Sequence, residues 1–301
     1  MKTNTTRLLP AEFRDDRILI RLVTRDGVPL QLLTDTGGGL VLTEEAVRKA
    51  GLVPDSTEVV GNKTFPAVDL PFGEEDETVP PLLIGGRPGK FLVMSEPRGV
   101  LEGLDGLIGQ AWFADRVWVF DYILRQFIYD PDVIAGGAMK DSPHTVPLGF
   151  LHNDQGSRMN SFPRIQVKID GEVVDLLFDT GASIELSEQG AAGYADDGGR
   201  VRGTSFITLS LFQKWKRRNP DWRVIERAEQ HTGLPVIEVP EVEVAGYTVG
   251  PVWFTARPDP NFHTYISQWM DRRVEGALGG SCFRYFRITA HFPEAWACFE
   301  R

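Results

Sequence analysis

The chain of 301 residues has little cysteine, no long apolar run and no spacing of histidines that suits a metal ion. Its two cysteines, Cys282 and Cys298, cannot form a disulfide framework, and free thiols are expected in preference to a single bridge. No run of about 18 apolar residues occurs, so no membrane-spanning helix is expected. The five histidines are not paired with one another or with cysteine, which predicts that the protein holds no metal.

Basic residues are outnumbered by acidic ones. The net charge of −10 and the isoelectric point near 5.1 argue against an extended phosphate-binding surface, so nucleic acid is not expected as a partner. A short basic cluster around Trp215 is interpreted as the solvated face of a helix. The first 16 residues are polar and lack the apolar core of a signal peptide, which predicts a cytoplasmic protein. Removal of a leader from a longer precursor would instead make it periplasmic or secreted.

Turn-forming residues, by contrast, are plentiful: 31 glycines and 20 prolines are spread along the chain. The hydrophobic content of 42% and the charged content of 25% are typical of a folded globular protein. Frequent turns between short elements favour a β-rich chain over a helical bundle. The expected fold class is therefore all-β, mainly β with a few short helices, and the length allows two domains of ordinary size.

One segment of the chain occurs twice, 144 positions apart. Residues 26–37, DGVPLQLLTDTG, match residues 170–181, DGEVVDLLFDTG, without a gap. Each copy is interpreted as a hairpin with an Asp-Gly turn, because this pair adopts the left-handed backbone that a two-residue turn requires. A second tight turn, Asp-Thr-Gly, follows the apolar strand in each copy. Asp35 and Asp179 therefore hold equivalent positions.

A second repeated motif follows in each half, at an offset of 170. Residues 106–109, GLIG, match residues 276–279, GALG. Each copy is expected to lead through a short helix into a β-hairpin, over residues 120–129 in the first half and 287–299 in the second. Two motifs in the same order in both halves indicate an internal duplication.

The duplication sets the expected domain boundaries. The predicted organisation is an N-terminal lobe over residues 1–138, a linker rich in Gly, Pro, Ser and Asn over 139–160, and a C-terminal lobe over 161–301. The two motifs lie 26 residues further apart in the second half. This insertion is expected around residues 196–230, where the spacing of apolar residues over 205–218 predicts a helix.

The two Asp-Thr-Gly turns, each followed by an apolar-apolar-Gly segment, resemble the pepsin/retropepsin superfamily of aspartic peptidases. The sequence LDGLIG over residues 104–109 is most similar to the bacterial retropepsin-like branch. The resemblance covers both halves, about residues 17–130 and 163–300. It implies a pepsin-like bilobal acid protease architecture, in which two β-barrel lobes are related by a pseudo-two-fold axis. Since both lobes are in one chain, a monomer is expected.

The resemblance also implies a catalytic site. Asp35 and Asp179 would activate a water between them and hydrolyse a peptide bond without a metal or an organic cofactor. Residues expected to support the catalytic loops are Thr36, Gly37, Thr180, Gly181 and Ser183. Residues expected to pack beneath the loops are Ile108, Gly109, Leu278 and Gly279.

The two loops differ after the shared tripeptide. The second continues with Ala182 and Ser183, whose hydroxyl is expected to hydrogen-bond Asp179 and to favour its ionised state. The first continues with Gly38 and Gly39, which offer no hydroxyl. We therefore expect Asp35 to hold the shared proton more often than Asp179.

The hairpin that closes the cleft of pepsin-like enzymes, the flap, often carries a tyrosine near its tip. No tyrosine lies between the first Asp-Thr-Gly turn and residue 121. The best candidate for a flap is the turn at Gly61 and Asn62, on its position and its turn chemistry. Phe65 or Phe72 could then supply an aromatic wall, although core or loop positions are the simpler interpretation for both.

Two matched positions and four tryptophans complete the expectations. Asp121 and His291 correspond at the offset of 170 and are expected near the lobe surface, without a catalytic role. Four tryptophans are expected to pack in the core or between the lobes: Trp112, Trp118, Trp253 and Trp296.

Two functions from different classes fit these observations. The first is an aspartic endopeptidase that holds a protein or peptide substrate extended between the lobes. The alternative is a catalytically silent module that keeps the fold in order to bind peptides or proteins. Retention of both Asp-Thr-Gly turns favours the enzyme, because a binding module has no physical need for paired carboxylates.

Overall fold

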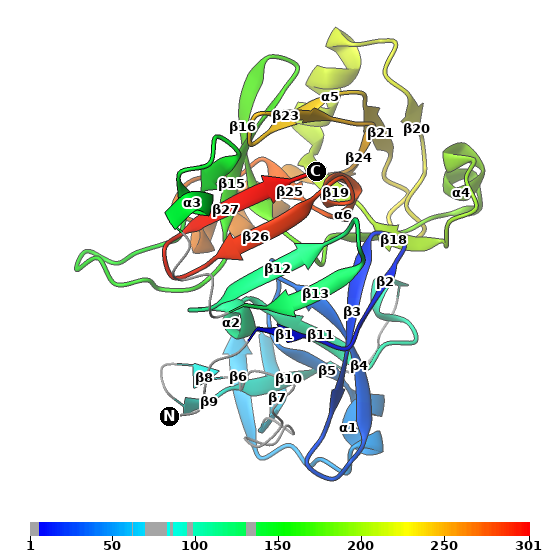
Figure 1. Ribbon diagram of the computed structural model, residues 1–301. Helices are drawn as coiled ribbons and strands as arrows, with labels where there is room; N and C mark the ends of the chain where they lie inside the picture. Colours follow the sequence, from blue (N-terminus) through cyan, green and yellow to red (C-terminus); the bar gives the residue numbers. More distant parts are fainter. Residues whose placement is uncertain (1–5, 62, 70–82, 85–86, 95–98, 131–136) are drawn as a thin grey trace.

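The computed structural model describes residues 6–61, 63–69, 83–84, 87–94, 99–130 and 137–301. Two lobes, each built on one large β-sheet, lie on either side of a six-stranded sheet to which both contribute (Figure 1). The first half of the chain forms the lower lobe in this view and the second half forms the upper one. The mainly β architecture confirms the predicted fold class.

The N-terminal lobe contains an eight-stranded sheet in the order β2-β3-β4-β11-β5-β10-β7-β6. Its strands are β2 (Ala11–Arg14), β3 (Arg17–Val23), β4 (Pro29–Asp35), β5 (Val41–Thr43), β6 (Ser56–Val60), β7 (Lys63–Asp69), β10 (Lys90–Met94) and β11 (Gly106–Gly109). The short pair β8 (Leu83–Ile84) and β9 (Arg87–Pro88), the helix α1 (Glu44–Lys49) and the 3₁₀ helix η1 (Gly99–Leu101) complete the lobe.

The C-terminal lobe contains a nine-stranded sheet in the order β20-β21-β24-β19-β25-β16-β15-β22-β23. Its strands are β15 (Arg164–Ile169), β16 (Glu172–Phe178), β19 (Ser205–Thr208), β20 (Val224–Ile225), β21 (Val236–Val239), β22 (Val242–Val244), β23 (Tyr247–Val249), β24 (Val252–Arg257) and β25 (Gly276–Leu278). The other elements of this lobe are β17 (Ser183–Glu185), α4 (Glu188–Tyr194), β18 (Val201–Gly203), α5 (Leu209–Arg218), η3 (Asn261–Ile266), η4 (Ser267–Trp269) and α6 (Gly280–Phe283).

The two large sheets share one topology. The order β3-β4-β11-β5-β10-β7-β6 in the first lobe corresponds to β15-β16-β25-β19-β24-β21-β20 in the second. Parallel and antiparallel pairs also correspond: β11 is parallel to β4 and antiparallel to β5, as β25 is to β16 and β19. The duplication seen in the sequence is therefore a duplication of the fold.

The predicted Asp-Gly turns join the strands that carry the site. In the second lobe Asp170 and Gly171 both adopt the left-handed backbone, with φ of 53° and 78°, between β15 and β16. This is the conformation of the tight turn that suits the twist of a hairpin. In the first lobe Gly27, with φ of 80°, lies in the slightly longer connection between β3 and β4.

The central sheet joins the lobes with a symmetric register. Its order is β1-β13-β12-β26-β27-β14, from β1 (Arg7–Leu8), β12 (Val117–Asp121), β13 (Gln126–Tyr129), β14 (Thr145–Pro147), β26 (Arg287–His291) and β27 (Trp296–Glu300). Strands β12 and β26 are antiparallel, and Val119 pairs with Thr289 at their midpoint. These two residues are 170 positions apart, so the pseudo-two-fold axis passes between them.

The matched residues Asp121 and His291 are not near the surface, contrary to the prediction. Their exposed fractions are 1% and 2%, because the strands that carry them lie inside the central sheet. Asp121 forms an ion pair of 2.8 Å with Arg287 across this sheet. The prediction failed because it treated each hairpin as the edge of its own lobe.

The helix predicted over residues 205–218 begins four residues later. Residues 205–208 form β19, which lies between β24 and β25 in the sheet, and α5 starts at Leu209. Ile207 pairs with Gly276 as Leu42 pairs with Gly106. These two equivalent residues are 165 positions apart, whereas the aspartates are 144 apart, so 21 extra residues lie between Asp179 and Ile207. Most of the insertion therefore lies earlier than residues 196–230.

This extra segment holds β17, α4 and β18, and it contacts the N-terminal lobe. The backbone N–H of Gly203 donates to the carbonyl of Asp15 at 2.6 Å, and the N–H of Gly199 donates to Asp15 Oδ1 at 3.0 Å. Asp16 forms an ion pair of 3.1 Å with Arg284. The turn between β2 and β3 thus fits into the second lobe.

The expectations for the tryptophans and the cysteines agree with the structure. Trp112, Trp118, Trp253 and Trp296 are all buried, and both cysteines are buried free thiols, as predicted. The expected linker contains the end of α3 (Gly137–Lys140) and the edge strand β14. No helix in the described part of the chain is long and apolar enough to cross a membrane.

Candidate active site

Asp35 and Asp179 lie where the central strands of the two lobes end. Asp35 is the last residue of β4, and Asp179 directly follows β16. Beneath the first turn Ile108 pairs with Thr34 and Gly109 with Asp35; beneath the second, Leu278 pairs with Phe178 and the N–H of Asp179 donates to the carbonyl of Leu278. A side chain at Gly109 would clash with the carbonyls of Gly38 and Gly39, and one at Gly279 would clash with the carbonyl of Thr204.

Thr36 and Thr180 hold the two turns together by a reciprocal set of hydrogen bonds. The N–H of each threonine donates to the hydroxyl of the other, at 3.2 Å and 3.0 Å. The hydroxyl of Thr36 donates to the carbonyl of Phe178 at 2.7 Å, and that of Thr180 donates to the carbonyl of Thr34 at 3.1 Å. Both threonines are fully buried. Four hydrogen bonds across the lobe boundary therefore fix the separation of the turns.

The glycines of each turn leave room for the carboxyl group of the other. A methyl group on Gly37 would lie 2.5 Å from Cγ of Asp179, and one on Gly181 would lie 2.3 Å from Cγ of Asp35. The N–H of Gly37 donates to Oδ1 of Asp35 at 3.1 Å, and that of Gly181 donates to Oδ1 of Asp179 at 2.9 Å. Glycine is required at both positions because of this close approach, and each carboxyl group faces the opposite loop.

Burial and mutual proximity give the two carboxyl groups different acidities. Burial raises the pKa of Asp35 well above its ordinary value, and the charge of Asp179 and a hydrogen bond to it raise this pKa further. Burial also raises the pKa of Asp179, but the hydrogen bond from Asp35 and backbone N–H groups oppose that increase. Two adjacent carboxyls share one proton and titrate as a coupled pair.

Ser183 does not hydrogen-bond Asp179, contrary to the prediction. Its hydroxyl donates to the carbonyl of Gly181 at 2.8 Å and so braces the turn rather than the carboxylate. The asymmetry of the pair therefore comes from burial and backbone donors, not from this hydroxyl. At the equivalent position Gly39 has open space, with no atom within 4 Å of where a Cβ would lie.

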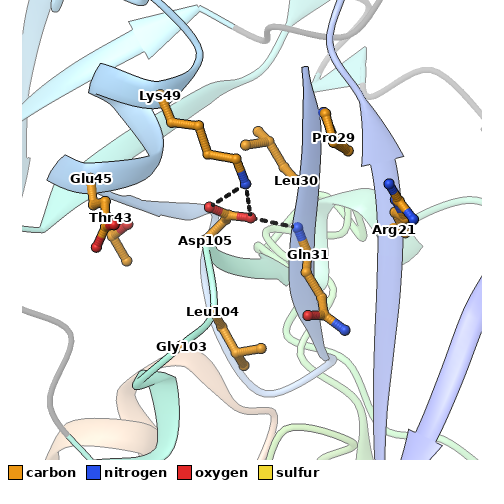
Figure 2. A pocket seen from close by; sticks show the side chains of 10 residues that line it. All are labelled: Arg21, Pro29, Leu30, Gln31, Thr43, Glu45, Lys49, Gly103, Leu104 and Asp105. Carbon is orange, nitrogen blue, oxygen red and sulfur yellow. Dashed lines mark hydrogen bonds and ion pairs between the residues drawn. The ribbon is translucent and has the colours of Figure 1, made fainter. Parts of the chain in front are cut away.

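Asp105, in the segment before the first apolar-Gly motif, lines a separate cavity of about 500 Å³ (Figure 2). Figure 2 shows Lys49 of α1 and the backbone of Gln31 directed at its carboxylate. Lys49 Nζ lies 2.9 Å from Asp105 Oδ2, and the N–H of Gln31 donates to the same oxygen at 2.8 Å. Glu275 is the matching residue of the second lobe, where it accepts from His263 and Thr208. These acids connect strands and helices within each lobe.

A cavity of about 330 Å³ opens beside Asp179. Gly37 and Asp179 line one side of it, and the side chains of η3 line another. Sequence analysis did not identify this pocket. The aromatic spacing of Phe262, Tyr265 and Trp269 was the available signal, but it does not distinguish a pocket wall from a core helix.

The proposed flap turn joins a real hairpin. Strands β6 and β7 are antiparallel, and Gly61 at their junction has φ of 63°. Asn62 and Phe72 lie outside the described residues, and Phe65 is half-buried on β7. Val59 and Val60 near the turn are 69% and 37% exposed, so the hairpin presents apolar side chains to solvent. Its role as a flap stays a prediction.

Among the residues that the structure describes, no three His, Cys, Asp or Glu side chains lie close enough together to hold a metal ion. The groups that the site does offer are the carboxyl pair, the backbone N–H donors beside it and the adjoining cavity.

Comparison with known proteins supports the fold. No family model matches the chain, and no curated protein matches its sequence. Among solved structures, the aspartic proteinase from Irpex lacteus superposes with a TM-score of 0.53 at 11% identity, over 98% of this chain and 97% of that one. The basic 7S globulin from soybean superposes with a TM-score of 0.46 at 9% identity, over 98% of this chain and 95% of that one. The first likeness shows that the chain has the two-lobed fold of pepsin-like aspartic proteinases, as the sequence predicted.

Proposed function

We propose that the protein is an aspartic endopeptidase whose catalytic pair is Asp35, from the lobe over residues 1–138, and Asp179, from the lobe over 161–301. The observation that carries the proposal is the reciprocal arrangement of the two turns. Each carboxyl group lies against a glycine of the opposite loop, and two buried threonines bind the loops together. Burying two adjacent carboxyls is unfavourable, and a peptide-binding surface gains nothing from it.

The mechanism follows from the unequal acidities. Asp179, ionised, accepts a proton from a water between the two carboxyls, and the water oxygen forms a bond to the carbonyl carbon of the scissile peptide. Asp35 donates its proton to the carbonyl oxygen, which becomes a hydroxyl of the tetrahedral intermediate. As the carbon–nitrogen bond breaks, Asp179 gives its proton to the departing nitrogen and Asp35 recovers one from a hydroxyl. Both carboxyls then return to their starting states.

The substrate is proposed to be a protein or peptide in an extended conformation, because the pair lies at the boundary between two lobes and faces an open cavity. Both halves of the site belong to one chain, so the proposed active form is a monomer. The water and the two carboxyls supply every proton that the reaction needs, the loop amides donate hydrogen bonds to the carboxyls, and the proposal invokes no cofactor.

The test is cleavage of unfolded casein and of a peptide library from acidic to neutral pH, with and without pepstatin. Asp179→Asn is expected to lower kcat/KM by about a thousandfold, the scale of a lost general acid or base. Asp26→Asn, an exposed aspartate outside the site, is the matched control and should keep full activity. Circular dichroism of each variant checks that the fold is intact.

Persistent cleavage by Asp179→Asn would refute the catalytic pair. A wild-type protein that binds unfolded peptides but cleaves none of them would instead support the alternative, a silent peptide-binding module.

A further inference from the structure

We propose that the pocket beside Asp179 selects a substrate carboxylate next to the scissile bond, through the guanidinium of Arg257. This inference rests on the proposed peptidase function and adds a substrate preference to it. The pocket shares Gly37 and Asp179 with the site, so a side chain that fills it belongs to a residue close to the cleaved bond.

Arg257 is the last residue of β24 and lies on the wall of the pocket. Its guanidinium carbon is 4.4 Å from the ring centroid of Phe206, which also lines the pocket. This stacking holds the planar group in one orientation. Nη1 donates to the carbonyl of Ala256 at 3.1 Å, which leaves most of the five N–H donors of the group for a ligand.

No carboxylate of the described residues lies within ion-pair distance of Arg257. The closest acidic influence is that of Glu229, whose charge acts on the guanidinium from further away. Glu229 is itself engaged, because Thr232 donates to its Oε2 from both its N–H and its hydroxyl. The cation is thus held in place without a counter-ion from the described part of the fold.

Leu177, Phe206, Phe262 and Ile266 give the pocket an apolar wall around Arg257, and Asp179, Asn261 and Tyr265 add polar groups at other points of its lining. Burial among such groups lowers the pKa of Arg257, yet an arginine keeps its charge in proteins. A partly desolvated cation gains most from an anion that it can bind with two parallel hydrogen bonds, and a carboxylate has that geometry.

The pseudo-symmetry of the lobes shows that this cation is specific to one side of the site. Thr43 pairs with Met94 in the first lobe as Thr208 pairs with Arg257 in the second. Met94 is therefore the equivalent of Arg257, and it is apolar. The equivalent position of the first lobe therefore carries no cation.

The second lobe has a longer connection at this pocket than the first lobe has at the matching place. The connection from β24 to β25 spans residues 258–275, whereas the matching connection from β10 to β11 spans residues 95–105. The longer connection includes the π-helix η3, which supplies Phe262, Tyr265 and Ile266 to the pocket. Helical turns of this kind are frequent at functional sites.

The test uses fluorogenic peptides that are identical except for glutamate, glutamine or leucine at each of the two positions that flank the cleaved bond. In a further pair of peptides the flanking residue is the last one, and the chain ends in a free carboxylate in one peptide and in an amide in the other. For one flanking position we expect kcat/KM to be roughly tenfold to a hundredfold higher with glutamate than with glutamine, the range of one charge-assisted interaction. Arg257→Met, which copies the equivalent residue of the first lobe, should abolish this ratio.

The controls distinguish a side-chain carboxylate from a terminal one. They also distinguish a failure of the pocket preference from a failure of the peptidase function. A preference for the free terminus over the amide, without a preference for glutamate, would assign the pocket to a terminal carboxylate. Arg217→Gln, on the outer face of α5, should leave every ratio unchanged. Equal cleavage of the glutamate, glutamine, acid and amide peptides would overturn the inference while the peptidase function stands.

If no peptide is cleaved, the same peptides are titrated by fluorescence anisotropy against the wild type and Arg257→Met. Tighter binding of the acidic peptide, lost in the variant, would then support the pocket without the peptidase function. Equal binding would overturn the inference.

Discussion

Asp35 and Asp179 carry the same side chain on equivalent turns, yet the proposed mechanism gives the shared proton to Asp35. Burial and the neighbouring charge raise the pKa of Asp35 well above its ordinary value. The proposed mechanism requires Asp35 to be protonated. Activity is therefore expected at pH values below the raised pKa of Asp35 and is lost as the pH rises through that pKa. The acid limb of the profile follows Asp179, which must remain ionised.

The substitution Gly39→Ser tests the cause of this asymmetry. The equivalent residue, Ser183, donates to the carbonyl of Gly181 and not to a carboxylate. A serine at position 39 has room for its side chain and is expected to donate to the carbonyl of Gly37 in the same way. The basic limb of kcat/KM against pH should therefore move by less than about half a pH unit, equivalent to about 0.7 kcal/mol.

A basic limb displaced to clearly lower pH would contradict this prediction. It would mean that the new hydroxyl stabilises the ionised form of Asp35.

At the scale of single residues, the sequence indicated which residues form the candidate site but not which atoms their side chains contact. The repeated frame of hairpin, Asp-Thr-Gly turn and apolar-Gly strand indicated both aspartates and both threonines. The partner of Ser183 was not predictable, because a hydroxyl beside a tight turn reaches backbone carbonyls as easily as the adjacent carboxylate. Arg257 gave no signal at all, since its position in the site depends on the pairing of β19 with β24.

Among the elements, the β6–β7 hairpin is the predicted flap. Its exposed valines, Val59 and Val60, lie next to the turn and are not needed by the core. If the hairpin closes over a bound peptide as a flap, these side chains become buried only in the complex.

We therefore expect the double variant Val59→Ser, Val60→Ser to change the free energy of unfolding by less than about 0.5 kcal/mol. The same variant should raise KM for an apolar peptide by about tenfold, because each valine loses apolar burial with the substrate. Urea denaturation and steady-state kinetics measure the two quantities. Val53→Ser, at a residue that is 79% exposed elsewhere, is the control. An unchanged KM in the double variant would exclude the hairpin as the flap.

The helix predicted over residues 205–218 shows the limit of periodicity as a guide. Residues 205–208 continue the apolar spacing of the helix that follows, so the sequence favoured one helix from 205 to 218. In the structure the first four residues fill a gap between β24 and β25, where only an extended chain satisfies both neighbours. Sheet pairing between distant segments decided the outcome, and no local pattern reports it.

For the whole molecule, the central sheet is the feature that makes two lobes one body. Strands β12 and β26 meet at the pseudo-two-fold axis, where Val119 pairs with Thr289. Both residues are buried, and the hydroxyl of Thr289 finds no hydrogen-bond partner among the described residues. An unpaired buried hydroxyl is unfavourable, so this joint between the lobes is less stable than it could be.

The variant Thr289→Val makes the axis symmetric and is expected to raise the free energy of unfolding by about 1 kcal/mol. Thr34→Val is the contrasting variant, because its hydroxyl donates to the carbonyl of Ile18 at 3.1 Å and its loss should destabilise the protein by about 1 kcal/mol. Urea denaturation followed by circular dichroism measures both changes. A destabilised Thr289→Val protein would show that the hydroxyl has a partner.

The symmetric pairing of β12 with β26 also has a consequence for synthesis on the ribosome. Strand β12 is translated about 170 residues before its partner, so one edge of it stays open during that interval and exposes unpaired N–H and C=O groups. The second aspartate and its threonine arrive in the same late half. The incomplete chain is therefore prone to associate with other strands, and under the proposed function its peptidase activity begins only when the last strands have emerged and joined the sheet.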